Sequence, residues 1–288
     1  MRRFELLEPR SLQEACGILA EREDVRPIAG GTALLILIKQ GIYIPTTLLN
    51  LKKIKGASDL SFDPERGLRV GALTSIYDLE TSPVIREHYP VLAYACHVVA
   101  NVRIRNMATI GGNLAHADYQ SDPPAVLIAL GARVELTSHE GSREVKLADF
   151  LLGSYETALR PGELLSALLV PPLPPDIRGS YIKFTSCSSK DRPCVGVVAM
   201  ARVEEGVCRE ARLVVGAVSP KPVRVSGAEE FSQEKKLTSE VIEEMAVEAS
   251  RVVDPIDDLR GSANYKRHVT RVLARRALSQ VANEGGRA

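Results

Sequence analysis

Two glycine-rich segments, about eighty residues apart, constrain this chain more than any other feature. The first reads Ala-Gly-Gly-Thr-Ala-Leu at residues 29–34, and the second reads Thr-Ile-Gly-Gly-Asn-Leu at residues 109–114. Adjacent glycines remove the side chains that would block a close approach of the backbone, and they allow positive φ. We expect each segment to lie between a strand and a helix, so that the two clamp one charged ligand. A dinucleotide diphosphate is the ligand that such a pair favours.

The spacing within the first segment excludes one common nucleotide fold. It lacks the G-x-G-x-x-G pattern of a Rossmann site, and no acidic residue follows at the distance where that site holds a ribose. A single Gly-Gly pair is as often only a tight turn, but two pairs in similar surroundings favour a binding role. The side chains of Thr32, Thr109 and Asn113 would add further hydrogen-bond donors.

The composition is that of an ordinary globular protein, with 45% hydrophobic and 25% charged residues. A net charge of +1, an aromatic content of 5% and the lack of tryptophan argue against a nucleic-acid surface. None of the five cysteines forms a C-x-x-C pair, which argues against a disulfide framework, a zinc site or an iron–sulfur cluster in this chain. We see no signal peptide and no apolar run of membrane-spanning length, and we expect a cytoplasmic protein with reduced thiols.

The chain is long enough for two domains, and its clearest linker is the proline-rich stretch at 171–175. We predict a first domain at 1–172, with subdomains at about 1–55 and 56–172, and a second domain at 176–288. Ser11 and Glu14 predict a capping box at the start of a helix. The expected strands lie at 25–29, 47–51, 68–72, 133–136, 163–170, 180–184, 195–203 and 212–218. The expected helices lie at 11–19, 34–40, 75–79, 91–102, 124–130, 237–253 and 262–281, and residues 283–288 are expected to be disordered.

The residues around the second glycine segment carry a family resemblance. The string Ile-Arg-Asn-Met-Ala-Thr-Ile-Gly-Gly-Asn-Leu at 104–114 is followed by Ser-Asp-Pro-Pro at 121–124 and Leu-Gly-Ala at 130–132. On these residues the chain resembles the FAD-binding (medium) subunits of molybdenum hydroxylases, of the carbon monoxide dehydrogenase and xanthine dehydrogenase type. The resemblance runs over essentially the whole chain, with further matching motifs at 70–74, 161–165, 181–184, 215–218, 222–224, 265–267 and 275–278.

The resemblance implies an α+β fold: a two-part FAD-binding domain of the vanillyl-alcohol oxidase (PCMH) type, then a smaller α+β domain with an antiparallel sheet and C-terminal helices. We expect the FAD to be noncovalent, because no histidine is obviously placed for covalent attachment. The two glycine segments would grip the FAD pyrophosphate, Asp122 would reach the cofactor, and Leu165 and Lys183 would line its isoalloxazine side. The cofactor-binding residues so implied are Ile28, Ala29, Gly30, Gly31, Thr32, Ala33, Leu34, Thr109, Ile110, Gly111, Gly112, Asn113, Asp122, Leu165 and Lys183.

Some of these residues have a simpler structural interpretation. Lys183 could be a solvated surface lysine rather than a cation that stabilises the negative charge of reduced flavin. Asp122 could cap the helix that begins near Pro123, with or without a cofactor contact. His116 and Asp118 are more typical of structural roles, and they do not complete a metal site. The chain departs from the family pattern at Ala33 and Tyr119, and at Cys187, where a basic residue is common.

The resemblance also implies partners and a role. Electrons would pass from a molybdenum-cofactor large subunit, through the [2Fe-2S] clusters of a small subunit, to FAD in this chain and on to an external acceptor. No catalytic acid–base residue and no metal ligand is expected here. The arginines of the last predicted helix suit a solvated face, or a surface that docks an acidic partner. Two other functions stay open: a self-sufficient FAD-dependent reductase or oxidase, and a non-catalytic assembly module.

Overall fold

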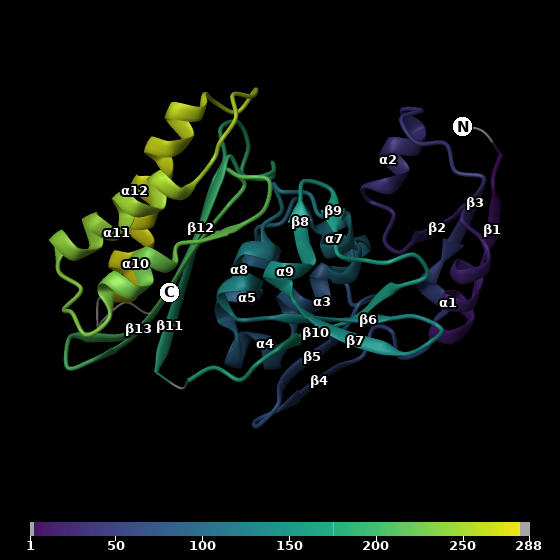
Figure 1. The fold of residues 1–288 in the computed structure, drawn as a ribbon, viewed down its shortest axis with the longest axis horizontal. Helices are drawn as coiled ribbons and strands as arrows, with labels where there is room; N and C mark the ends of the chain where they lie inside the picture. The colour runs from purple at the N-terminus through teal and green to yellow at the C-terminus, as the bar shows by residue number, and fades with distance from the viewer. Residues whose placement is uncertain (1–2, 175, 283–288) are drawn as a thin grey trace. The chain divides into compact units, whose positions relative to one another are not determined.

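The computed structural model describes residues 3–174 and 176–282, and the chain divides into two compact units (Figure 1). Unit 1 is built from Met1–Leu79, Asn101–Ala117 and Ala132–Pro172. Unit 2 is built from Glu80–Ala100, Asp118–Gly131 and Leu173–Ala288. Helices and mainly antiparallel sheets make the fold α+β, as the resemblance implies. The disorder expected at 283–288 lies outside the described residues.

The first part of unit 1 is a small parallel sheet in the order β1-β3-β2, formed by β1 (Glu5–Leu7), β3 (Thr47–Asn50) and β2 (Val25–Ile28). Helices α1 (Leu12–Glu21) and α2 (Leu34–Lys39) and the short 3₁₀ turn η1 (Leu51–Lys53) connect its strands. The predicted capping box at α1 is only half formed. Ser11 Oγ accepts from the Glu14 amide at 3.1 Å, but the Glu14 carboxylate accepts from the Arg10 amide at 2.7 Å.

The second part of unit 1 is an antiparallel sheet whose central strand, β10 (Leu164–Val170), is almost wholly buried. A strand of the sequence Leu-Leu-Ser-Ala-Leu-Leu-Val suits this place, since both of its faces are covered. The order is β4-β5-β10-β6-β7, with β4 (Leu60–Asp63), β5 (Gly67–Gly71), β6 (Arg133–Thr137) and β7 (Ser142–Lys146). The accompanying elements are α3 (Ile76–Thr81), α6 (Val102–Met107), α7 (Ile110–His116), α9 (Leu147–Phe150), β8 (Leu151–Gly153) and β9 (Glu156–Thr157).

Unit 2 is a sheet with helices on both faces (Figure 1). Its strands follow the order β11 (Ile177–Phe184), β12 (Val195–Glu204), β13 (Val207–Gly216) and β14 (Val223–Arg224). One face packs on α10 (Ser226–Ser232), α11 (Ser239–Val252) and α12 (Ala263–Ala282). The other packs on α5 (Pro90–His97), next to α4 (Pro83–His88), and on α8 (Pro123–Ala129). This double coverage explains why β12 reads as a continuous apolar run.

Two expectations about local structure are wrong. The helix expected at 91–102 is interrupted: α5 ends at His97, Ala100 has a φ of +42°, and Asn101 caps a new helix, α6, by accepting from the Ile104 amide at 3.2 Å. The second glycine segment does not lie between a strand and a helix, because Gly111 and Gly112 belong to the first turn of α7. The short elements β1, β4, β7, β8, β9, β14, α4, α6, α7, α9 and α10 were not anticipated, since so few residues show little periodicity.

Candidate functional site

The two glycine segments lie against each other within unit 1. A Cβ atom on Gly30 would stand 2.1 Å from the carbonyl oxygen of Met107 and 2.9 Å from the Cα of Ala108. A Cβ atom on Gly112 would stand 3.7 Å from the Cβ of Ala29. The fold therefore brings together two segments that are about eighty residues apart, and only glycine at position 30 permits this approach.

The second segment is anchored to the antiparallel sheet of unit 1 through Gly111. A Cβ atom there would lie 2.5 Å from the Cβ of Ala72, and the Gly111 amide donates to the Ala72 carbonyl at 2.8 Å. The Ala72 amide in turn donates to the carbonyl of Ser166 on β10 at 3.0 Å. Leu165, the neighbour of Ser166, is buried where the pairing of β10 with β6 shifts register.

The first segment has unused backbone donors. Within the part of the chain that the structure describes, the N–H groups of Gly30, Gly31, Thr32 and Ala33 have no hydrogen-bond acceptor. Gly31 has a φ of +73°, which glycine adopts without strain. These residues are half-buried between β2 and the start of α2, as the sequence predicts. Consecutive unpaired amides of this kind form an anion-binding concavity.

The second segment differs, because its backbone donors are already occupied. Their acceptors are the Thr74 carbonyl for Ile110 at 3.0 Å, the Ala72 carbonyl for Gly111 at 2.8 Å, the Thr109 hydroxyl for Gly112 at 3.1 Å and the Thr109 carbonyl for Asn113 at 2.9 Å. Of the two segments, the first is thus the one with unoccupied backbone donors. The second supplies the surface on which the first rests.

In unit 2 the predicted residues Asp122 and Lys183 form a buried ion pair. Lys183 Nζ lies 3.0 Å from Asp122 Oδ2 and donates to the Val98 carbonyl at 2.8 Å. The side chain of Lys183 is only 6% exposed, so it is not a solvated surface lysine. Among the described residues, these two acceptors are all that the ammonium contacts, which leaves its third N–H available.

Asp122 stands at the N-cap position of α8 but makes no side-chain capping bond to the described amides of that helix. Its other oxygen, Oδ1, accepts instead from the hydroxyl of Tyr181 at 2.8 Å. Burial raises the pKa of Asp122 to about 6, although the Lys183 charge and both hydrogen bonds act in the opposite direction. Burial and the neighbouring Asp122 raise the pKa of Tyr181 well above its usual value. The two hydrogen bonds and the nearby Lys183 favour the charged form of Asp122, and its Oδ2 lies at ion-pair distance from Lys183 Nζ.

Tyr181 was not among the predicted site residues. The sequence held a signal for it: Tyr181 and Lys183 are two apart on a predicted strand, and such residues share a face. The other polar residues near the second segment make structural contacts. The ring of His116 packs 5.2 Å from that of Tyr155, and Asp118 pairs with Arg192 at 3.0 Å.

The basic residues of α12 are largely paired within unit 2. Arg271 and Arg275 contact Glu243 on α11, and Arg267 lies 3.9 Å from Asp254. These contacts favour the interpretation of a solvated, internally paired face over that of a docking surface. Cys187 is exposed.

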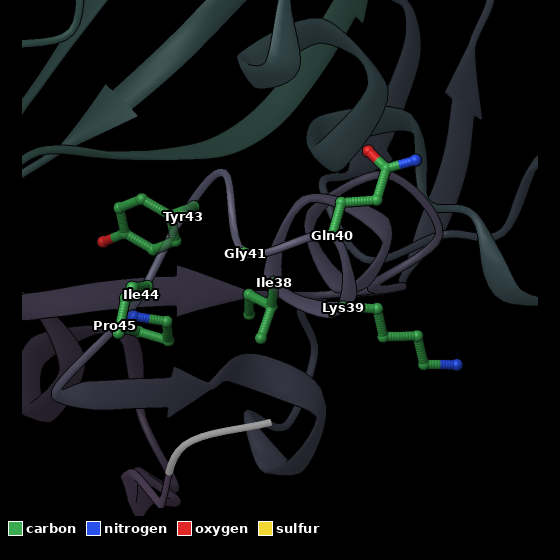
Figure 2. A pocket seen from close by; sticks show the side chains of 7 residues that line it. All are labelled: Ile38, Lys39, Gln40, Gly41, Tyr43, Ile44 and Pro45. Carbon is green, nitrogen blue, oxygen red and sulfur yellow. The ribbon is translucent and has the colours of Figure 1, made fainter.

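A pocket of about 250 Å³ lies at the far end of α2 from the glycine segment (Figure 2). Its lining comprises Ile38, Lys39, Gln40, Gly41, Tyr43, Ile44 and Pro45, as Figure 2 shows. None of these is a predicted site residue. With mostly apolar walls and no carboxylate or histidine, it offers little chemistry of its own.

Comparison with known proteins identifies the family. Residues 2–173 match the family described as the FAD binding domain in molybdopterin dehydrogenase, and residues 180–281 match the CO dehydrogenase flavoprotein C-terminal domain. The chain belongs to the FAD-binding medium subunits of the molybdenum hydroxylases. It is a subunit of an oxidoreductase, its cofactor is FAD, and the unpaired amides of the first segment fit the diphosphate of that cofactor.

Individual relatives match over nearly their full length. The glyceraldehyde dehydrogenase medium chain of Sulfolobus acidocaldarius is 31% identical, covering 97% of this chain and 98% of that protein. A solved carbon monoxide dehydrogenase from Hydrogenophaga pseudoflava has a TM-score of 0.94 at 31% identity, covering 97% of both chains. Quinoline 2-oxidoreductase from Pseudomonas putida 86 has a TM-score of 0.93 at 29% identity, covering 98% of this chain and 97% of that one. In the described part of this chain, no helix has both the length and the apolar character to cross a bilayer.

Proposed function

We propose that this chain is the electron-transfer subunit of a multi-subunit molybdenum hydroxylase. It would link the [2Fe-2S] clusters of a small subunit to an external electron acceptor, while a large subunit with the molybdenum cofactor oxidises the substrate. The proposal rests on membership of the medium-subunit family, whose curated relatives include a carbon monoxide dehydrogenase medium chain and a xanthine dehydrogenase FAD-binding subunit. The cysteine pattern supports a cytoplasmic location.

The observation that carries the binding part is the row of unpaired amides at residues 30–33. Backbone N–H groups that point at a diphosphate neutralise its charge without any lysine or arginine. Thr109, Ile110 and residues 111–113 would contribute the packed support beside them. Ile28, Ala29 and Leu34 would flank the anion site, and Leu165 is proposed from the resemblance as a residue that lines the flavin.

Asp122 and Lys183 are proposed as cofactor contacts on the strength of the resemblance and of their chemistry. When bound, FAD accepts and releases electrons, and this redox chemistry belongs to the cofactor rather than to the protein. The chain's part is to bind FAD, to exclude water and to hold a fixed positive charge. Lys183, held by Asp122 and the Val98 carbonyl, has one N–H left with which to donate to an anionic acceptor.

A copurification experiment tests the assembly. We expect FAD to be bound in a one-to-one ratio with this chain, and molybdenum and iron to appear only when partner subunits copurify. A purified chain that takes up no FAD would support the assembly-module alternative and refute our proposal. Rapid flavin reduction by NADH or by small alcohols without partners would instead support a self-sufficient reductase or oxidase.

Gly112→Val tests the clamp itself. The added side chain would enter the space beside Ala29, so we expect FAD retention to be lost while the chain still folds. Gly17→Val is the matched control, because Gly17 lies in α1 and a Cβ atom there would have no other atom within 4 Å. FAD content and the circular dichroism spectrum would be measured for both variants. Normal FAD content in Gly112→Val would refute the clamp.

A further inference from the structure

The buried contacts around Asp122 involve three side chains from two elements of unit 2. Tyr181 and Lys183 are two residues apart on β11, so both side chains lie on the same face of the sheet, the face on which α8 packs. Each binds a different oxygen of Asp122: Tyr181 binds Oδ1 at 2.8 Å, and Lys183 binds Oδ2 at 3.0 Å. A carboxylate held at both oxygens cannot rotate away from either partner.

The neighbouring strands leave room for this arrangement. Gly196 lies opposite Lys183 in the β11–β12 pairing, and a Cβ atom there would stand 2.7 Å from the Tyr181 hydroxyl oxygen. Gly216 lies opposite Gly196 in the β12–β13 pairing, and a Cβ atom there would stand 3.1 Å from the Cβ of Ala125 on α8. Two paired glycines thus make space for the phenol and for the close approach of α8.

We propose that Tyr181 is a positioning residue for Lys183 and acts through Asp122. By holding Oδ1, Tyr181 fixes the plane of the carboxylate, so that Oδ2 meets the ammonium at one place. The Val98 carbonyl supplies the second fixed contact, and the direction of the third N–H of Lys183 follows from these two. The use of that N–H for the cofactor rests on the proposed function, whereas the coupling of Tyr181 to Lys183 does not.

A double-mutant cycle with Tyr181→Phe and Lys183→Met tests the coupling. No direct hydrogen bond joins these two side chains among the described contacts, so independent roles would give additive effects on the unfolding of the cofactor-free chain. We expect clear non-additivity in urea unfolding, because both substitutions act on the same carboxylate. Additive effects would overturn the proposal. Tyr265→Phe serves as the control. It removes a hydroxyl in the same unit, and that hydroxyl makes no hydrogen bond among the described residues.

FAD titration of the same variants separates this inference from the proposed function. We expect Tyr181→Phe to raise the dissociation constant for FAD about three- to tenfold, as for one lost hydrogen bond. In the Lys183→Met background the same substitution should have no further effect, and the flavin midpoint potential should follow the same pattern. If Lys183→Met leaves FAD affinity and potential unchanged, the role of Lys183 fails while the unfolding cycle still decides the coupling. If Tyr181→Phe weakens FAD binding equally in both backgrounds, the positioning role is refuted and the proposed function stands.

Discussion

The two glycine segments look alike in sequence and differ in structure. In the first, the amides of residues 30–33 are unpaired, and Ala33 at the N-cap position of α2 provides no side-chain cap among the described residues. In the second, Thr109 caps α7 and the amides of residues 110–113 are all used. One segment thus offers donors to a ligand, and the other is a closed helix start against which the first packs.

The comparison shows that a Gly-Gly pair can be required for different structural reasons. Gly30 and Gly111 are required for clearance, since their Cβ atoms would overlap backbone atoms of Met107 and Ala72. Gly31 is required for its φ of +73°. Gly112 meets none of these demands as strongly, because the closest atom to its Cβ position is the rotatable hydroxyl of Thr109 at 2.8 Å. Of these four glycines, Gly112 is thus the one whose added Cβ atom would meet a movable side chain rather than backbone or a strained φ.

The largest expected effects come from the clearance glycines. Gly30→Ala and Gly111→Ala should each lower the free energy of unfolding by about 3 kcal/mol or more, because backbone atoms must move to admit the methyl group. Urea unfolding of the cofactor-free chain measures this. Gly17→Ala, in open space on α1, should leave stability unchanged or slightly raised. Near-normal stability of Gly30→Ala would show that the two segments do not pack as closely as described.

Amide hydrogen exchange tests the contrast between unpaired and occupied donors. Without FAD, the amides of residues 30–33 should exchange quickly and those of residues 110–113 slowly. FAD at about 100 times its dissociation constant should slow exchange in the first segment by up to about a hundredfold, or roughly 2.7 kcal/mol. The second segment should change much less. Equal protection of both segments by FAD would remove the distinction between them.

The sequence was most informative where long elements carry a clear pattern. It predicted α11 with its Thr238 cap, α12 and the buried strands β10 and β12 within a few residues. It did not predict that the second glycine segment is helical, because glycine disfavours a helix. Two factors oppose this preference: the local cap by Thr109 and the tertiary contact of Gly111 with Ala72.

Part of the site could be inferred from the sequence. The motif around the second glycine segment indicated the family, and the family resemblance singled out Lys183, which the structure shows to be buried. The contacts that surround Lys183 join residues far apart in the chain: 59 positions for Tyr181 and Asp122, 61 for Lys183 and Asp122, and 85 for Lys183 and Val98. They depend on two glycines in neighbouring strands, Gly196 and Gly216, which a single sequence does not relate to each other.

The smallest expected effects separate the two threonines. Thr109→Ala removes the acceptor for the Gly112 amide and should lower the free energy of unfolding by about 0.5–2 kcal/mol, as for other lost N-caps. Thr109→Ser should retain most of that stability, since its hydroxyl can still accept. Thr32→Ala in the first segment should cost less than about 0.5 kcal/mol, because the Thr32 side chain makes no hydrogen bond among the described residues. Thermal or urea unfolding of the three variants measures the difference. If Thr32→Ala proved as costly as Thr109→Ala in the cofactor-free chain, the first segment would itself be capped, and its amides would no longer be the donors that distinguish it from the second.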